Sequence, residues 1–117
     1  YAPLGNNMTN QRKIVDYPQV ATIASRRKVS PSQVLIAWGV RRGYVVIPRS
    51  SNPEHIVNNY EQIELSDEEY KQVSSLVDEA GGPTRFFIPY KTFNPRWDIN
   101  VFNEPEEKEA SHQIKVT

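Results

Sequence analysis

Apolar side chains recur with the period of an α-helix in several stretches of this chain, and the first runs from about residue 16 to residue 29. Asp16 is a candidate N-cap, and Pro18 is tolerated in a first helical turn. Val29 closes the stretch. We expect one helix here, with a mostly apolar stripe made of Val20, Ile23, Ala24 and Arg27.

The second helix has a strong start signal. Ser30 can cap it, Pro31 suits the first helical position, and Gln33 completes a capping box. The helix should end near Arg41–Gly43, where cations favour the negative end of its dipole. Its apolar residues include Val34, Leu35 and Trp38.

A short, continuously apolar run at residues 44–47 predicts a buried parallel strand. Residues 1–5 have the pattern of the end of another strand, so the two strands and the helices between them would form a βαβ unit. Both faces of the strand at 44–47 need cover that this chain does not supply alone. The chain also begins without methionine, and we expect it to be part of a longer protein, although a processed terminus would begin in the same way.

Two more helices follow the run at 44–47. Asn52 can cap the first, with Pro53 at its first position. Ser66 and Glu69 form a capping box for the second, which should end at the glycines 81–82. The expected inner faces consist of Ile56, Val57 and Tyr60 in the first helix, and of Tyr70, Val73, Leu76 and Val77 in the second.

The regular pattern ends after residue 82. Aromatic residues alternate with prolines and polar residues over 83–103, which predicts a long packed loop, and the charged residues 104–117 are expected to be disordered. We therefore divide the chain into a partial domain at 1–82, a C-terminal loop at 83–103 and a tail at 104–117.

Composition narrows the possible functions. Lys plus Arg and Asp plus Glu number 14 each, so the zero net charge gives no reason to expect nucleic acid or an acidic membrane as a partner. The absence of cysteine excludes disulfides and thiolate metal sites, and the two histidines, His55 and His112, are far apart, so we expect no metal. No apolar run approaches the ~20 residues of a membrane span, and no signal peptide is evident. We expect a cytoplasmic protein.

Candidate chemistry is concentrated at residues 48–59. A helix that begins after a strand presents N–H groups and partial positive charge, which suit a phosphate. Arg49 would add a forked cation, and His55 a further donor one turn into the helix. The other polar residues are Ser50, Ser51, Asn52, Asn58 and Asn59. A capped helix beside a solvated arginine is the alternative, and the glycine-rich dinucleotide motif is absent.

Three segments resemble the aldo-keto reductase family. Ile47–Asn59 (IPRSSNPEHIVNN) is similar to the family segment at the end of the last barrel strand, and Tyr1–Gly5 (YAPLG) to the segment at the end of strand seven. Ser30–Trp38 (SPSQVLIAW) resembles the helix between them. The resemblance covers about residues 1–80, in the family's order and spacing, and is closest to fungal aldehyde and glycerol reductases.

This resemblance implies an α/β fold: the C-terminal portion, with strands seven and eight, of a (β/α)8 TIM barrel, where ligands bind at the C-terminal ends of the strands. It implies NADPH as the cofactor and a small carbonyl compound as the substrate of the complete protein. Tyr1 would stack on the nicotinamide, and Leu4 and Gly5 would line the pyrophosphate. By the same resemblance, Arg49, Ser50 and Asn52 would contact the 2′-phosphate, and Asn58 and Asn59 the adenine. Ser51 and His55 are further candidates for contact with the cofactor.

Departures from the family pattern also matter. His55 stands where many members carry arginine, and Ala2 where serine is common. The family's catalytic Asp, Tyr, Lys and His lie in the first half of its sequence, and none of them maps onto this chain. Trp97 and the neighbouring aromatics lie where the family's C-terminal loop shapes the substrate pocket, and a role in packing alone is the alternative.

Two other functions are compatible with parts of the sequence. The chain could be a non-catalytic scaffold that keeps only the cofactor site. Residues 18–47 could also form a winged helix-turn-helix that binds nucleic acid. However, the second helix is too apolar to face a groove, and the chain has no net positive charge.

Overall fold

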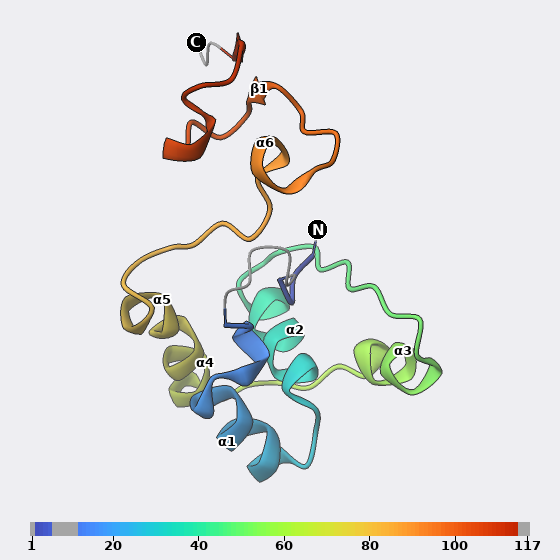
Figure 1. Cartoon of the computed structure of the whole chain (residues 1–117). Coiled ribbons are helices and arrows are strands. Elements are labelled where there is room, and N and C mark those ends of the chain that lie inside the picture. Colours follow the sequence, from blue (N-terminus) through green and yellow to red (C-terminus); the bar gives the residue numbers. More distant parts are fainter. Residues whose placement is uncertain (1, 6–11, 115–117) are drawn as a thin grey trace. The chain divides into compact units, whose positions relative to one another are not determined.

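A computed structural model describes residues 2–5 and 12–114 of the chain, and it divides into two compact units. Among the described residues, the first unit comprises 2–5 and 12–84, and the second comprises 85–114. Figure 1 shows the elements of both units along the chain.

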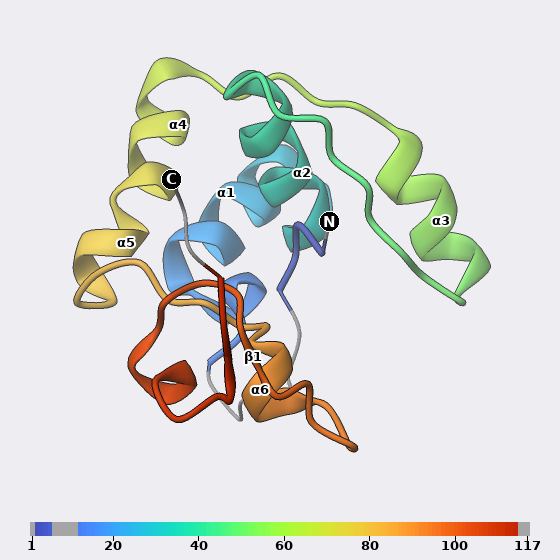
Figure 2. The ribbon, with the colours of Figure 1, turned by 90° about the horizontal axis from the view of Figure 1, so that it is seen from above.

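The first unit is helical. It contains the short 3-10 helix η1 (Ile14–Asp16) and the helices α1 (Pro18–Arg27), α2 (Pro31–Arg41), α3 (Pro53–Tyr60), α4 (Asp67–Ser74) and α5 (Leu76–Glu79). In Figure 2, α1 and α2 lie side by side, with α4 and α5 next to them. The core between these helices contains Val20, Ile23, Ala24, Val34, Leu35, Ala37, Leu65, Val73 and Leu76.

The expected helix at 16–29 is present but shorter at both ends. Asp16 belongs to η1, and the N-cap of α1 is Tyr17, which makes no side-chain cap. The fixed φ of Pro18 supports the helix at its first position instead. Lys28 ends α1 in the left-handed conformation, where its N–H bonds to the carbonyls of Ala24 and Ser25.

Both predicted capping boxes are confirmed. The Ser30 hydroxyl accepts a hydrogen bond from the N–H of Gln33 at 3.2 Å, and the Gln33 side chain accepts one from the N–H of Ser30 at 2.9 Å. Ser66 and Glu69 repeat this pattern at the start of α4. The predicted helix after Ser66 is interrupted at Ser75, which separates α4 from α5.

The predicted strand at residues 44–47 is wrong. These residues run through the structure without strand pairing, and the side chains of Val45 and Ile47 are 85% and 64% exposed. Residues 2–5 form a turn, closed by the N–H of Gly5 on the carbonyl of Ala2 at 2.9 Å, instead of a strand end. A strand exists only where its backbone bonds to a neighbouring strand, whereas the N–H of Tyr44 bonds back to the carbonyl of Gly39 in α2 at 3.0 Å.

Helix α2 is too deeply buried for nucleic-acid recognition. Val34, Leu35, Ile36 and Ala37 are all buried, so the helix that would have to enter a groove is part of the core. The structure therefore gives no support to a winged helix-turn-helix.

The second unit contains α6 (Pro89–Thr92), the strand β1 (Ile99–Asn100), the 3-10 helix η2 (Pro105–Glu107) and the strand β2 (His112–Gln113). β1 and β2 are parallel, with Ile99 opposite His112. Within residues 104–114, the side chains of Glu107 and Ala110 are buried. Glu107 obtains its hydrogen-bond partners from nearby backbone N–H groups.

Candidate functional site

Asn52 organises the start of α3, where the sequence placed the candidate phosphate site. Its side-chain oxygen accepts hydrogen bonds from the backbone N–H groups of Glu54 at 2.9 Å and of His55 at 3.4 Å. The N–H of Asn52 in turn donates to the hydroxyl of Ser50 at 3.1 Å. The turn before α3 is therefore held by two short polar side chains, as the Asn52-Pro53 start signal predicts.

This capping leaves few free backbone donors at the start of α3. Pro53 has no N–H, those of Glu54 and His55 bond to the Asn52 side chain, and that of Ile56 bonds to the carbonyl of Asn52 at 3.0 Å. A helix start that follows a strand predicts unpaired N–H groups here, and the structure differs because the Asn52 side chain accepts from two of them. Any anion here would depend mainly on side chains and on the helix dipole.

Arg49 is the cation closest in sequence to this turn. Its side chain is exposed, and it forms no ion pair with any acidic residue in the described part of the chain. His55 is also exposed, in the first turn of α3. An exposed, unpaired guanidinium can bind a phosphate in a bidentate manner without first breaking a salt bridge.

Asn58 and Asn59 lie in the last part of α3 and are half-buried. Neither side chain is hydrogen-bonded to another residue that the structure describes. Their amide groups can therefore still donate to and accept from a ligand.

Three of the candidate cofactor contacts, Tyr1, Leu4 and Gly5, lie at the N-terminus. Tyr1 lies outside the described residues. Leu4 is half-buried and packs against the core of the first unit. Gly5 has a φ of 70°, a left-handed conformation that favours glycine, and its N–H is used in the turn with Ala2.

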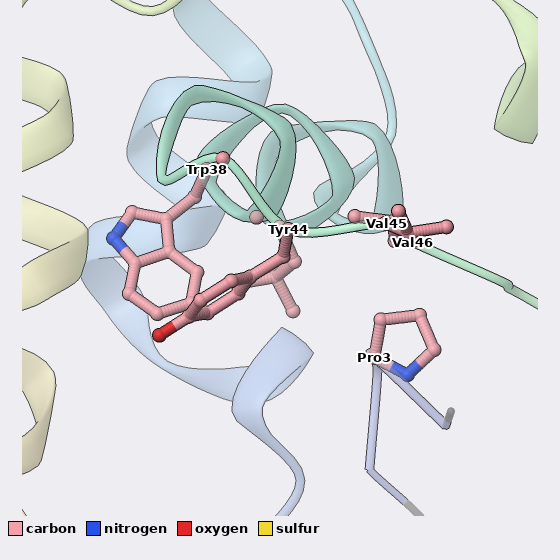
Figure 3. Close-up of a pocket in the computed structure, with 8 residues that line it drawn as sticks. Pro3, Trp38, Tyr44, Val45 and Val46 are labelled. Carbon is pink, nitrogen blue, oxygen red and sulfur yellow. The ribbon is translucent and has the colours of Figure 1, made fainter.

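A cavity of about 540 Å³ lies between the N-terminal turn and the segment after α2. No pattern in the sequence predicts it. Figure 3 shows Pro3 facing Val45 and Val46 across it, with Trp38 and Tyr44 on another side. The remaining lining residues are Leu35, Gly39 and Gly43. The cavity brings residue 3 next to residues 44–46, which precede Arg49 in the chain.

The aromatic wall of this cavity, formed by Trp38 and Tyr44, is held by a hydrogen bond and by ring contacts. The Trp38 indole N–H donates to the Ser74 hydroxyl at 2.9 Å, and the Trp38 and Tyr44 rings meet edge to face at 6.4 Å. The Arg42 guanidinium lies over both rings, 5.2 Å from Trp38 and 5.6 Å from Tyr44. The continuous apolar run at 44–47 does not reveal this wall, because such a run predicts a strand that includes Tyr44.

The described part of the chain contains neither a metal-binding group nor a membrane-spanning helix. No group of three or more His, Cys, Asp or Glu side chains there could hold a metal ion. No helix among these residues has the length and apolar character needed to cross a membrane.

Comparisons with known proteins agree on one relationship. The model of the Aldo/keto reductase family matches residues 3–78. The chain is 37% identical to the D/L-glyceraldehyde reductase of Hypocrea jecorina over 99% of its own length and 36% of that protein. It is also 37% identical to the glycerol 2-dehydrogenase (NADP(+)) of Hypocrea jecorina, over 91% of the chain and 32% of that protein.

A solved structure is similar as well. The aldose reductase of Giardia lamblia matches with a TM-score of 0.67 and 27% sequence identity, over 80% of this chain and 32% of that chain. The chain thus spans about a third of the length of the curated relatives it matches.

Proposed function

Because the chain belongs to the aldo/keto reductase family, we propose that it is the C-terminal portion of an NADP(H)-dependent reductase with a (β/α)8 barrel. The complete, cytoplasmic protein would reduce a small aldehyde or ketone to an alcohol. This chain would supply much of the cofactor site, and the catalytic Asp, Tyr, Lys and His would come from outside it.

The observation that carries this proposal is the turn at residues 49–55. The family match includes the whole turn, and Arg49 is exposed there beside the capped start of α3, with no acidic partner among the described residues. The names of three relatives include NADP(+) or NADPH, which supports a cofactor with a 2′-phosphate.

The side chains at this turn fit a nicotinamide dinucleotide phosphate. Arg49 would bind the 2′-phosphate, and His55 and the hydroxyl groups of Ser50 and Ser51 would add donors. Asn58 and Asn59 would contact the adenine. When bound, the reduced cofactor supplies the hydride, and these residues hold it and orient it.

Substitution of Arg49 tests the assignment in the intact reductase that contains this chain. A hydrogen bond to a charged group contributes about 1.5–3 kcal/mol, so Arg49→Ala should weaken NADPH binding by roughly 10- to 150-fold. NADH binding should change little, because NADH lacks the 2′-phosphate. Fluorescence titration of both cofactors gives the four dissociation constants.

Arg12→Ala is the control, because it removes another exposed arginine from the same unit. It should leave both cofactor affinities unchanged. Equal losses for NADPH and NADH in Arg49→Ala would contradict the 2′-phosphate assignment. NADPH binding without turnover of any aldehyde by the intact protein would favour the non-catalytic alternative.

A further inference from the structure

Glu107 in the second unit is a charged side chain with no exposed surface. Its carboxylate accepts hydrogen bonds from the backbone N–H groups of Val101, Phe102 and Glu104, each at 3.0 Å. Both carboxylate oxygens are used: Val101 donates to Oε1, and the other two residues donate to Oε2. A short loop of the backbone is thus wrapped around one side chain.

The same loop is closed from its other side by Asn100. The Asn100 side-chain oxygen accepts from the N–H of Asn103 at 2.7 Å, and its amide nitrogen donates to the side chain of Gln113 in β2 at 2.7 Å. Asn103 has a φ of 58°, which turns the chain back toward Glu107. Successive N–H groups that converge in this way form a concave site for an anion.

The loop satisfies the charge of Glu107 without a salt bridge to it. Burial alone would raise the pKa of the Glu107 carboxyl, but hydrogen bonds from the N–H groups of Glu104, Val101 and Phe102 favour the charged form, and the pKa is lowered overall. The lysine and arginine nearby pair with other carboxylates: Lys91 with Glu106, and Arg85 with Glu104.

The loop also holds the beginning of the second unit. The Arg85 Nε donates to the Glu104 carboxylate at 2.9 Å, and the Arg85 guanidinium lies 4.0 Å from the centre of the Phe102 ring. Phe102 and Glu104 are two of the three residues whose N–H groups bind Glu107. One carboxylate therefore orders both the loop and the two side chains that bind Arg85.

We propose that Glu107 is an internal latch: its carboxylate occupies an anion site formed by the backbone of residues 101–104, and this contact keeps the loop closed and Arg85 held. Without the carboxylate, several backbone N–H groups would be left buried and unpaired, so the loop would open. The latch is independent of any cofactor and of reductase activity.

Amide hydrogen exchange, followed by NMR in the ¹⁵N-labelled chain, tests the latch. In the wild type, the N–H groups of Val101, Phe102 and Glu104 should be protected. Glu107→Gln removes the charge and one acceptor position at nearly constant volume, and it should speed exchange at these residues by about 10-fold or more. Glu106→Gln is the matched control, because Glu106 is an exposed neighbour that pairs with Lys91.

The pattern of exchange decides between a latch and a general loss of stability. Faster exchange at 101–104 in Glu107→Gln, with unchanged exchange in α2 and in Glu106→Gln, supports the latch. Glu107→Ala should open the loop further and release Arg85, whose Nε–H would then exchange faster as well. Unprotected amides at 101–104 in the wild type, no change in either Glu107 variant, or an equal increase in α2 would each overturn the proposal.

Discussion

At the scale of single residues, Asn52 has two possible uses for one side chain. The resemblance makes it a contact of the 2′-phosphate, but in the structure its oxygen caps α3. Only its amide NH₂ group then remains for a ligand. Asn52 would therefore shape the turn that carries Arg49, and any contact it makes with the phosphate would come from the nitrogen.

Substitutions at Asn52 should separate these two uses. Asn52→Ala removes the cap and should destabilise α3 by about 1 kcal/mol, whereas Asn52→Asp retains an N-cap that is equally good. Amide exchange at Ile56–Asn59 should therefore accelerate in the alanine variant only.

In the intact reductase, the Asn52 substitutions should affect NADPH binding differently from the way they affect the stability of α3. Asn52→Asp places a negative charge beside the proposed phosphate site, so it should weaken NADPH binding while α3 stays formed. Ser51→Ala is the control for α3, since the Ser51 side chain forms no hydrogen bond with a described residue. Loss of α3 in Asn52→Asp would contradict the capping role.

At the scale of elements, Glu69 joins the end of α1 to the start of α4. Its carboxylate binds Arg27 at 2.5 Å and Arg26 at 2.7 Å, and it also accepts the N–H of Ser66 at 2.8 Å as part of the capping box. The side chain is almost completely buried, and hydrogen bonding from Arg27 is the main reason that the pKa of Glu69 falls to about 2. Glu69 therefore links the last turn of α1 to the first turn of α4.

Glu69→Gln should lower the free energy of unfolding by about 2–3 kcal/mol at pH 7, because a charge-assisted network loses its anion. The pKa of Glu69 lies below its ordinary value of 4.5, so its stabilising effect is complete above that pH and is lost as the pH falls toward about 2. Urea unfolding at several pH values, followed by circular dichroism, measures both effects.

Glu68→Gln provides the matched control, because Glu68 is the exposed neighbour of Glu69 on the same helix. Its stability should stay close to that of the wild type at every pH. A difference between Glu69→Gln and the wild type that persists unchanged at pH 2 would contradict the assigned role of the carboxylate.

At the scale of the whole molecule, the segment after α2 is a part of the first unit where large apolar side chains remain exposed. Tyr44, Val45 and Ile47 are exposed hydrophobic residues within four positions, next to a cavity that Tyr44 and Val45 line. Val46 contacts α2 so closely that a Cβ on Gly39 would lie 3.0 Å from its Cγ2, so only one side of the segment is covered. Exposed apolar side chains on a segment without strand partners favour association with other chains.

Val45→Lys should therefore have opposite effects in two settings. In the chain alone it should reduce self-association, measured by sedimentation velocity, because it places a charge on the exposed segment. In the intact reductase it should lower the melting temperature, because the rest of the proposed barrel would cover this segment and bury the lysine. Val77→Lys, at a less exposed apolar position on α5, is the control and should do neither. Improved stability in the intact protein would contradict the burial of this segment in the complete protein.

The chain alone should also be inactive. Under the proposed function it lacks the proton donor, and general acid catalysis contributes typically 10²–10⁴-fold. Purified chain should therefore not oxidise NADPH with D/L-glyceraldehyde as substrate, as measured by absorbance at the nicotinamide band. Turnover by rigorously purified chain would contradict the absence of catalytic residues.

The sequence by itself determined where α2, α3 and α4 begin. The capping pairs Ser30–Gln33 and Ser66–Glu69 and the Asn52-Pro53 start need only residues within one turn, so local chemistry was sufficient to predict them. The motifs around Arg49 were equally readable, and they led to the family that the comparisons identify. The helix boundaries at Asp16 and Ser75 differ from the prediction, because backbone geometry and tertiary packing override weak local signals there.

Only the tertiary structure decided how the remaining residues are used. Whether 44–47 forms a strand depends on hydrogen-bond partners far away in sequence, which no local pattern contains. The cavity beside Trp38 and the order around Glu107 arise from side chains and backbone groups that meet only after the chain has turned. Local sequence fixes which helices can begin, whereas burial and hydrogen bonding between distant segments fix which apolar and charged residues are covered.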